Sequence, residues 1–526
     1  MERKPEYQEL WTLYILAVER LKAVYQQEKT SYYQVAGIHG QPWIPWDNVP
    51  SWSDEPTWGY CPHNGILFAP WHRPYILTYE QLLHQHVLDI VNEISDPDTK
   101  TRYREAATKF RIPYWDWAEN PPEGEHVLPS SVYGETLHIT FPNGTVATVA
   151  NPLFEYRFHP LIPEDFSTDG SSPYNLWNKT YRLPLPYDSP NPVDSIPDAL
   201  ARIDGNLGSA RSGLFSLFKT WQAFNRFSNQ SPGYNPQIGN LETVHGNIHS
   251  AFLWGHMWFA TIAAYDPVFW LHHANVDRQI ALWQAVYPDS YVEPERSVRE
   301  TTFTINSDWE VGPDSDLTPF HRNSEGAFWT PALVRDVERL GYTYPELQDR
   351  PSNETLKMRI RDLYDDSASA RLVVRQGGAQ DKTSRDWKAL IELPTGYSAS
   401  VFLGEAGSDP VNWPAEENYV GSFSTTFNIG MGSETDVLNG LVGLTANIAK
   451  AHESGMLGSV EEDSVVDYLK ANLKWKVASA EGKVVASSEI AKFKIGVFSH
   501  LQTVPQSASE FPSIISTKEY PEITGA

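Results

Sequence analysis

The chain has 526 residues and carries 41 Lys and Arg against 66 Asp and Glu, which gives a net charge of −25 at pH 7. This length exceeds what one ordinary core accommodates and predicts more than one domain. So large an acidic excess argues against a nucleic-acid partner and against an anionic membrane surface, because no basic cluster would offset the repulsion of phosphate groups.

The cysteine content and the N-terminal residues bear on the cellular compartment. Cys61 is the single cysteine of the chain, so an internal disulfide is excluded and the fold depends on its core. The first residues, Met-Glu-Arg-Lys-Pro-Glu, lack the apolar centre of a signal peptide, and no stretch has the roughly 18 uninterrupted apolar residues of a membrane span. We therefore expect a cytoplasmic protein, or a secreted one if a leader was removed.

The first part of the chain alternates helical patterns with loops. Residues 6–27 place apolar side chains at helical spacing and predict an amphipathic helix. Residues 31–50 are interrupted by Gly and Pro and predict a loop, which contains His39. A helical pattern then covers residues 66–90, and the short aromatic segment 111–118 is expected to pack behind the helices that hold a metal.

The middle of the chain contains further predicted helices after a long irregular segment. Residues 119–210 are rich in Pro, Ser, Asn and Gly and predict loops over a helical body. Helical patterns follow over residues 213–227, 241–252 and 267–286. The last of these is preceded by Asp266, a residue type that favours the N-cap position.

The pattern changes beyond residue 347. Residues 348–370 are charged and polar, as is typical of a linker. Short alternating segments separated by Gly, Pro and Ser follow and predict strands of a β-rich, sandwich-like domain. We therefore divide the chain into a mainly α domain over residues 1–347, a linker over 348–370 and a β-rich domain over 371–526.

Histidines of the first domain suggest two metal sites. His245 and His249 lie four residues apart on a predicted helix and can both reach one metal, and His273 lies on a helix that can pack against the first. His39, His63 and His72 form a second set. A lone loop histidine such as His39 is usually a surface residue, and only the company of the other two changes that interpretation. Imidazoles without carboxylates suit copper or zinc, and three nitrogens per metal leave coordination positions open for catalysis.

Two longer stretches resemble a known family. Residues 63–80 and 266–277 are similar to the two copper-binding signatures of type-3 copper proteins, which are tyrosinases, catechol oxidases and hemocyanins. Residues 31–40, 113–118 and 342–344, together with the β-rich domain, resemble further marks of the fungal tyrosinase group. The residues that carry the two signatures are His63, Phe68, Trp71, His72, Arg73, Glu80, Asp266, Pro267, Phe269, Trp270, His273 and Asp277.

This resemblance implies a four-helix bundle that holds two copper ions per chain. His39, His63 and His72 would bind the first copper, and His245, His249 and His273 the second. His272, Asp277 and Gly246 would lie directly behind or beside the ligands. In similar fungal enzymes, a cysteine at the position of Cys61 forms a thioether to the histidine at the position of His63; the alternative is a buried thiol that forms no such bond.

The resemblance also implies an activity. Tyrosinases use O2 to hydroxylate monophenols and to oxidise o-diphenols to o-quinones, and fungal members are latent while their C-terminal domain covers the copper site. Glu242 matches a glutamate that holds a water as base; its alternative interpretation is a carboxylate on the helix surface. Gly246 stands where several strong monophenolases have Asn, which leaves the strength of the monophenolase activity open.

Other activities stay open on the sequence alone. A catechol oxidase or o-aminophenol oxidase without strong monophenolase activity would use the same ligands, and so would a hemocyanin-like oxygen carrier. Glu242 and the single-chain fungal layout favour an enzyme with phenolic substrates and O2. Whether the chain forms a homo-oligomer is also left open.

Overall fold

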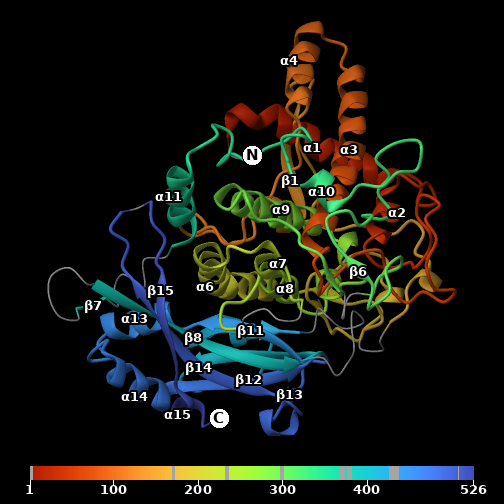
Figure 1. Ribbon diagram of the computed structural model, residues 1–526. Helices are drawn as coiled ribbons and strands as arrows, with labels where there is room; N and C mark the ends of the chain where they lie inside the picture. Colours follow the sequence, from red (N-terminus) through yellow and green to blue (C-terminus); the bar gives the residue numbers. More distant parts are fainter. Residues whose placement is uncertain are drawn as a thin grey trace.

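A helical region and a β region lie against each other in the computed structural model (Figure 1). The structure describes residues 4–525 except 169–171, 232–235, 297–300, 366–372, 376–381, 426–436 and 508. The expected fold class, a mainly helical domain followed by a β-rich one, is confirmed. Within the described ranges, no helix has both the length and the apolarity that crossing a membrane requires.

The longer helices of the helical region assemble around the histidines. α3 packs on α9, α6 packs on α8, and α1 covers α3. α9 is buried on nearly every face, and polar residues such as Asp277 and Arg278 are buried together with its apolar ones. These helices are α1 (Gln8–Ala23), α3 (Phe68–Glu93), α6 (Ile196–Thr220), α8 (Leu241–Ala251) and α9 (Val268–Val286).

Side chains order the starts of two helices, although the N-cap of α9 is Pro267, one residue after the predicted Asp266. Asn240 caps α8 by accepting a hydrogen bond from the amide of Thr243 at 2.8 Å. Asp266 accepts from the amide of Val268 at 3.0 Å and also pairs with the buried Arg182 at 2.7 Å. The start of α9 is therefore fixed both by a local cap and by an ion pair with a distant loop.

Short elements complete the helical region. The expected loop over residues 31–50 contains a short helix, because Ser31 caps it by accepting from the amide of Gln34 at 3.1 Å. The short helices are α2 (Tyr32–Gly37), α4 (Pro97–Thr108), α5 (Ser130–Tyr133), α7 (Phe224–Ser228) and α10 (Pro331–Val334), with 3-10 turns η1 (Pro5–Tyr7), η2 (Pro163–Asp165), η3 (Tyr174–Leu176), η4 (His256–Trp258) and η5 (Ala263–Tyr265). Paired short strands are β1 (Thr136–Thr140) with β2 (Val146–Ala150), β3 (Pro184–Leu185) with β4 (Val193–Asp194), and β5 (Glu295–Arg296) with β6 (Glu310–Val311).

The prediction of irregular structure up to residue 210 is wrong at its end, because α6 begins at Ile196. Glycines in this segment lowered its apparent helical propensity. A Cβ atom at Gly205 would lie 2.9 Å from the backbone oxygen of Pro414, so this glycine serves the close approach of the β region. The predicted helix over 213–227 is in turn divided, since α6 ends at Thr220 and α7 begins at Phe224.

The β region consists of two antiparallel sheets with helices at their edges. One sheet has the order β10-β9-β12-β13, and the other has the order β11-β8-β14-β15 with β7 paired to β8. Trp387, Ile391 and Val401 belong to the apolar core of this region. The elements are β7 (Val373–Arg375), β8 (Lys382–Pro394), β9 (Tyr397–Leu403), η6 (Trp413–Ala415), β10 (Tyr419–Ser424), β11 (Val437–Gly443), α13 (Thr445–Glu453), α14 (Glu462–Asn472), β12 (Leu473–Ser479), β13 (Val484–Val485), η8 (Ser487–Glu489), β14 (Lys494–Thr503), β15 (Ile514–Glu519) and α15 (Pro521–Thr524).

The segment 348–370 is not simply the polar linker that its composition indicates. Residues 353–364 form α11 (Asn353–Tyr364), whose Leu356, Ile360 and Tyr364 are buried at helical spacing. Charged residues cover the other faces of this helix and dominate its composition, which hid the narrow apolar stripe. The domain boundaries at 347 and 371 stay predictions, and residues 366–370 lie outside the described part of the chain.

The β region lies over α6 and α8. Strands β10 and β11 contact α6, and β10 also contacts α8. At this interface Lys219 of α6 pairs with Asp386 of β8 at 3.2 Å, and Lys388 donates to the hydroxyl of Ser216 at 2.7 Å. The indole of Trp254 donates to the carbonyl of Ala480 at 2.6 Å. The two regions are therefore joined by polar contacts as well as by apolar packing.

Candidate metal centre

The structure brings the predicted histidines together in two buried clusters. The donor atoms within each cluster all lie within 4.8 Å of one another. The first cluster contains His39, Cys61, His63 and His72, and the second contains His245, His249, His272 and His273. The six ligands expected from the sequence are thus placed three by three, as the resemblance implies.

The first cluster is assembled from three separate segments of the chain. His39 follows α2, and its Nδ1 bonds to the carbonyl of Ala260 at 2.8 Å. His72 lies on α3, and its Nδ1 bonds to the carbonyl of Phe68, one turn earlier, at 2.7 Å. Because each carbonyl fixes Nδ1 as the donor, Nε2 carries the lone pair that a metal requires. Within the described structure, Nε2 of His39 is buried without a hydrogen-bond partner, which fits a metal ligand.

Cys61 lies between two imidazoles of the first cluster. Its Sγ is 3.5 Å from Nδ1 of His63 and 3.3 Å from Nε2 of His72. These are distances between atoms that are not covalently bonded. The thiol is therefore adjacent to the ring that a thioether would join, and the thioether itself stays a prediction.

The second cluster is held by two helices. His245 and His249 project from successive turns of α8, and Nδ1 of His249 bonds to the carbonyl of Met257 at 2.8 Å. Nε2 of His273 on α9 lies 3.3 Å from Nε2 of His245 and 3.4 Å from Nε2 of His249. Three Nε2 atoms therefore converge on one point.

His272, the neighbour of His273, is the fourth histidine at the second cluster. Its ring is stacked on that of His245 with centroids 5.0 Å apart and lies 4.7 Å from that of His249. Within the described residues, neither of its ring nitrogens has a hydrogen-bond partner. His272 therefore belongs to the cluster by its position, and the choice of His273 over His272 as the ligand stays a prediction.

Burial keeps these imidazoles neutral. Desolvation lowers the pKa of His72 to about 4, and it lowers the pKa values of His39, His63, His245, His249, His272 and His273 well below the usual 6.5. Neighbouring imidazoles add to the effect, because two charged rings would repel each other. Neutral imidazoles offer lone pairs at neutral pH, so the donor set fits copper.

The two clusters are adjacent. The rings of His72 and His273 are stacked with centroids 4.3 Å apart and an interplanar angle of 13°. The ring of Phe68 lies 4.9 Å from those of His72 and His245, one in each cluster. Metals held by the two clusters would therefore be close neighbours.

Asp277 joins the helices that carry the two clusters. It accepts from Nε of Arg73 on α3 at 2.6 Å and from the hydroxyls of Tyr342 and Tyr344 at 2.7 and 2.6 Å. Arg73 and Asp277 are both buried. Arg73, Asp277 and the two tyrosines thus form one network that fixes α3 against α9.

Glu242 is a buried carboxylate, so the alternative interpretation as a residue on the helix surface is wrong. Its two oxygens accept from the amides of Asn64 at 2.7 Å and Gln230 at 2.9 Å. Burial raises its pKa to about 7, although the two hydrogen bonds counteract this rise. Because Asn64 follows His63, Glu242 also ties the loop of the first cluster to the helix of the second.

Gly246 borders open space beside His245. A Cβ atom built at this position would have no heavy atom within 4 Å. The sequence could indicate this position only by resemblance. Ala260 and Met257 orient His39 and His249 through their carbonyls, and the amide of Gln230 holds Glu242. These three residues left no signal in the sequence, because a backbone carbonyl or amide does not depend on the side chain.

Comparisons with known proteins agree with this geometry. Residues 29–286 match the model of the common central domain of tyrosinase, and residues 390–497 match that of the tyrosinase C-terminal domain. A tyrosinase of Neurospora crassa is 29% identical over 98% of this chain and 93% of its own length. Polyphenol oxidase 4 of Agaricus bisporus is 31% identical over 91% of this chain and 81% of its own length.

A solved structure of latent and active mushroom tyrosinase is similar along almost the whole chain. The TM-score is 0.81 at 27% sequence identity, with 98% of this chain and 95% of the other covered. Both the helical region and the β region are therefore shared. Together, the matched domains, these relatives and the two histidine clusters show that the chain belongs to the tyrosinase family of dicopper oxidoreductases.

Proposed function

We propose that this copper oxidase oxidises o-diphenols to o-quinones with O2, hydroxylates monophenols in the ortho position, and is latent while its β region covers the metal centre. The observation that carries the proposal is the convergence of two sets of three neutral imidazoles in adjacent clusters. His39, His63 and His72 would hold one copper. The other would be held by His245, His249 and His273. Copper bound there supplies the activation of O2.

Glu242 is the base that we propose for the monophenol. A carboxylate offers about four lone-pair positions, and only two are occupied by the amides of Asn64 and Gln230. The others can hold a water that accepts the phenolic proton. A pKa of about 7 suits this transfer at neutral pH, because the group is then partly ionised and still basic.

Gly246 supports a second candidate, an oxidase of catechols or o-aminophenols with weak monophenolase activity. Glycine supplies no polar side chain to orient a water beside Glu242, and it leaves space next to His245. This space admits ring substituents that a side chain would exclude. Both candidates use the same histidines and differ in how well a phenol is deprotonated.

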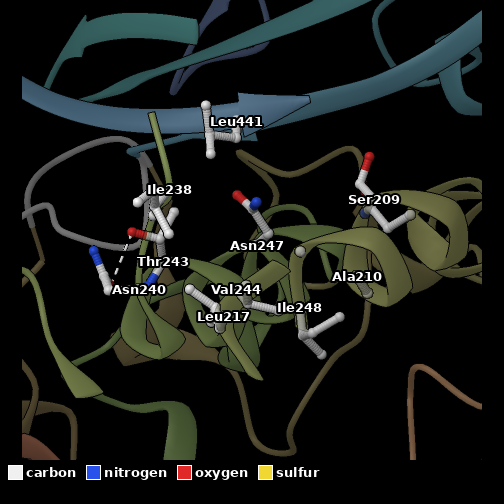
Figure 2. A pocket seen from close by; sticks show the side chains of 13 residues that line it. Ser209, Ala210, Leu217, Ile238, Asn240, Thr243, Val244, Asn247, Ile248 and Leu441 are labelled. Atoms are coloured by element: carbon white, nitrogen blue, oxygen red, sulfur yellow. Dashed lines mark hydrogen bonds between the residues drawn. The ribbon is translucent and has the colours of Figure 1, made fainter. Parts of the chain in front are cut away.

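Latency is supported by the position of the β region over α8. The amide of Ser424, the last residue of β10, lies 3.4 Å from Oδ1 of Asn247, the neighbour of Gly246. Figure 2 shows Leu441 of β11 above the face of α8 that carries Asn247 and Thr243. Latent forms are known for the mushroom tyrosinase to which this chain is similar.

The interface also contains a small cavity whose lining is mostly apolar. It has a volume of about 30 Å³ and lies between α6, α8 and β11 (Figure 2). Polar atoms of Asn206, Ser209 and Asn240 in its wall are buried and have no hydrogen-bond partner within the described structure. Such a volume holds about one water. Polar groups that stay unpaired weaken an interface, which favours separation after cleavage.

The test is oxygen uptake by the copper-loaded protein before and after limited proteolysis. L-tyrosine and catechol are offered separately. Uptake with both after cleavage supports a latent tyrosinase, and uptake with catechol alone supports the second candidate. Equal uptake before and after cleavage contradicts latency. Absence of uptake with both, despite two bound coppers, contradicts the oxidase and leaves an oxygen carrier.

A further inference from the structure

A buried polar network lies behind the second histidine cluster and includes a residue from the segment expected to be a linker. Arg278 of α9 donates to Asp116 at 2.8 Å and to Glu346 at 2.5 Å. Its guanidinium also lies 4.6 Å from the ring centroid of Tyr114. The hydroxyl of Tyr364, at the end of α11, also belongs to the network, because it accepts a hydrogen bond from Arg278.

The hydroxyl of Tyr364 has a full set of hydrogen-bond partners. It donates to Oδ2 of Asp116 at 2.8 Å, and it accepts from Arg278 at 2.9 Å and from Gln279 at 2.6 Å. One O–H group and two lone pairs are thereby used. Tyr364 is only 1% exposed, so loss of its hydroxyl would leave three buried polar groups with one hydrogen bond fewer each.

α11 is fixed to the helical region along its whole length. At its start, Asn353 donates to the carbonyl of Val286, the last residue of α9, at 2.7 Å. Leu356 and Ile360 belong to the apolar core of the helical region. At its end, the ring of Tyr364 is nearly parallel to that of Phe218 on α6, with centroids 6.3 Å apart. α11 therefore packs as part of the helical region.

The network reaches the second cluster through two elements. Arg278 and Gln279 lie on α9, between one and two turns after His273. Asp116 lies between Trp115, whose amide bonds to the carbonyl of Leu271 at 3.0 Å, and Trp117, whose ring lies 6.1 Å from that of His272. Tyr364 thus holds together the helix that bears His273 and the segment that packs behind it.

We propose that Tyr364 is a positioning residue for the second copper and that α11 belongs to the catalytic unit of the protein. The proposal rests on the assignment of His245, His249 and His273 to that copper. It does not depend on latency. Loss of the Tyr364 hydroxyl is expected to loosen α9 at His273 and to speed the release of one copper, while the first cluster keeps its metal.

The experiment compares copper release from the full-length protein and from Tyr364→Phe, which keeps the ring and removes only the hydroxyl. Copper per chain is followed by elemental analysis during dialysis against a chelator. Since partners behind metal ligands typically change affinity by about 10- to 100-fold, we expect one of the two coppers to leave about tenfold faster. Tyr25→Phe removes the hydroxyl of a tyrosine that is 60% exposed and is expected to match the wild type.

A second variant distinguishes a positioning role of Tyr364 from a purely structural one. Ile139→Val makes a small cavity at a buried position of β1, outside the network, and lowers the melting temperature without removing a polar group. The proposal holds if Tyr364→Phe releases one copper faster than Ile139→Val does at an equal or smaller loss of melting temperature. Release of both coppers in proportion to the loss of stability, or release at the wild-type rate, overturns it. A wild-type protein that does not bind two coppers refutes the assignment of ligands instead.

Discussion

The two histidine clusters reach similar donor sets by different means. The second cluster is built by local geometry, because His245 and His249 lie one turn apart on α8 and a single further helix supplies His273. The first depends on long-range contacts, since His39 is oriented by the carbonyl of Ala260, 221 residues away. The second cluster, which one helix pair forms, should therefore tolerate changes elsewhere in the fold. The first cluster should depend on the contacts that join its separate segments.

The largest effect is expected from breaking the ion pair between Arg73 and Asp277, which joins the helices of both clusters. Asp277→Asn leaves the buried guanidinium of Arg73 without its carboxylate, and breaking such a pair typically costs about 3–5 kcal/mol. We expect the free energy of unfolding in urea to fall by this amount and both coppers to be held less tightly. Glu338→Gln, which breaks an exposed pair with Arg350, should cost less than about 1 kcal/mol. Equal effects would contradict a joining role for Asp277.

The next largest effect is expected from breaking the contact between the helical region and the β region at Asp386. Burial opposes the ionisation of Asp386, but the ammonium groups of Lys388 and Lys219 outweigh it and hold the pKa of the carboxyl well below its usual range. Asp386→Asn leaves two buried cations without this partner, at a cost of about 3 kcal/mol. Because this weakens the contact of the β region, we expect the uncleaved Asp386→Asn variant to take up more oxygen with catechol than the uncleaved wild type does.

The same carboxylate predicts a pH dependence. Because the pKa of Asp386 is lowered in the folded protein, its stabilisation is complete above the ordinary pKa of about 3.9 and is lost as pH falls through the lower, folded value. Strong acid should therefore loosen the contact of the β region, which limited proteolysis in acid can detect if oxygen uptake is then measured at neutral pH after copper is restored. Glu392→Gln on the same strand, whose partner Lys494 is largely exposed, should behave as wild type. Unchanged latency in Asp386→Asn would contradict this account.

Cys61→Ser is expected to affect the first cluster alone. The thiol contacts His63 and His72, and its replacement removes both these contacts and any thioether. We expect one copper to be bound about tenfold less tightly, which competition with a chelator measures. The second copper is the internal control, and an equal loss of both would show that the clusters are not independent.

Gly246→Asn should have the smallest effect of this series. An amide beside Glu242 can hold the water that accepts the phenolic proton, and one such hydrogen bond contributes about 1 kcal/mol, or roughly fivefold in rate. We expect the ratio of uptake with L-tyrosine to uptake with catechol to rise by about this factor. Gly246→Ala adds bulk without an amide, and an equal rise in this variant would exclude the hydrogen bond as the cause.

The sequence allowed prediction of the second cluster and of the helices that carry it, because the spacing of His245 and His249 and the start at Asp266 are local signals. His39 could be included only through the company of His63 and His72, since its position depends on a carbonyl contributed by a distant turn. α11 was missed because three buried side chains in a charged segment do not change its composition. The start of α6 was also missed, because Gly205 lowered the helical propensity of this segment. Its small size serves the close approach of Pro414 instead.

The copper content of single-ligand variants tests the central claim most directly. Wild-type protein, His63→Ala and His245→Ala are loaded with copper, freed of excess metal and analysed for copper per chain. Two adjacent but separately held coppers predict two per chain in the wild type and one in each variant. Two coppers retained in either variant would contradict the ligand assignment, and loss of both from His245→Ala would contradict the independence of the clusters.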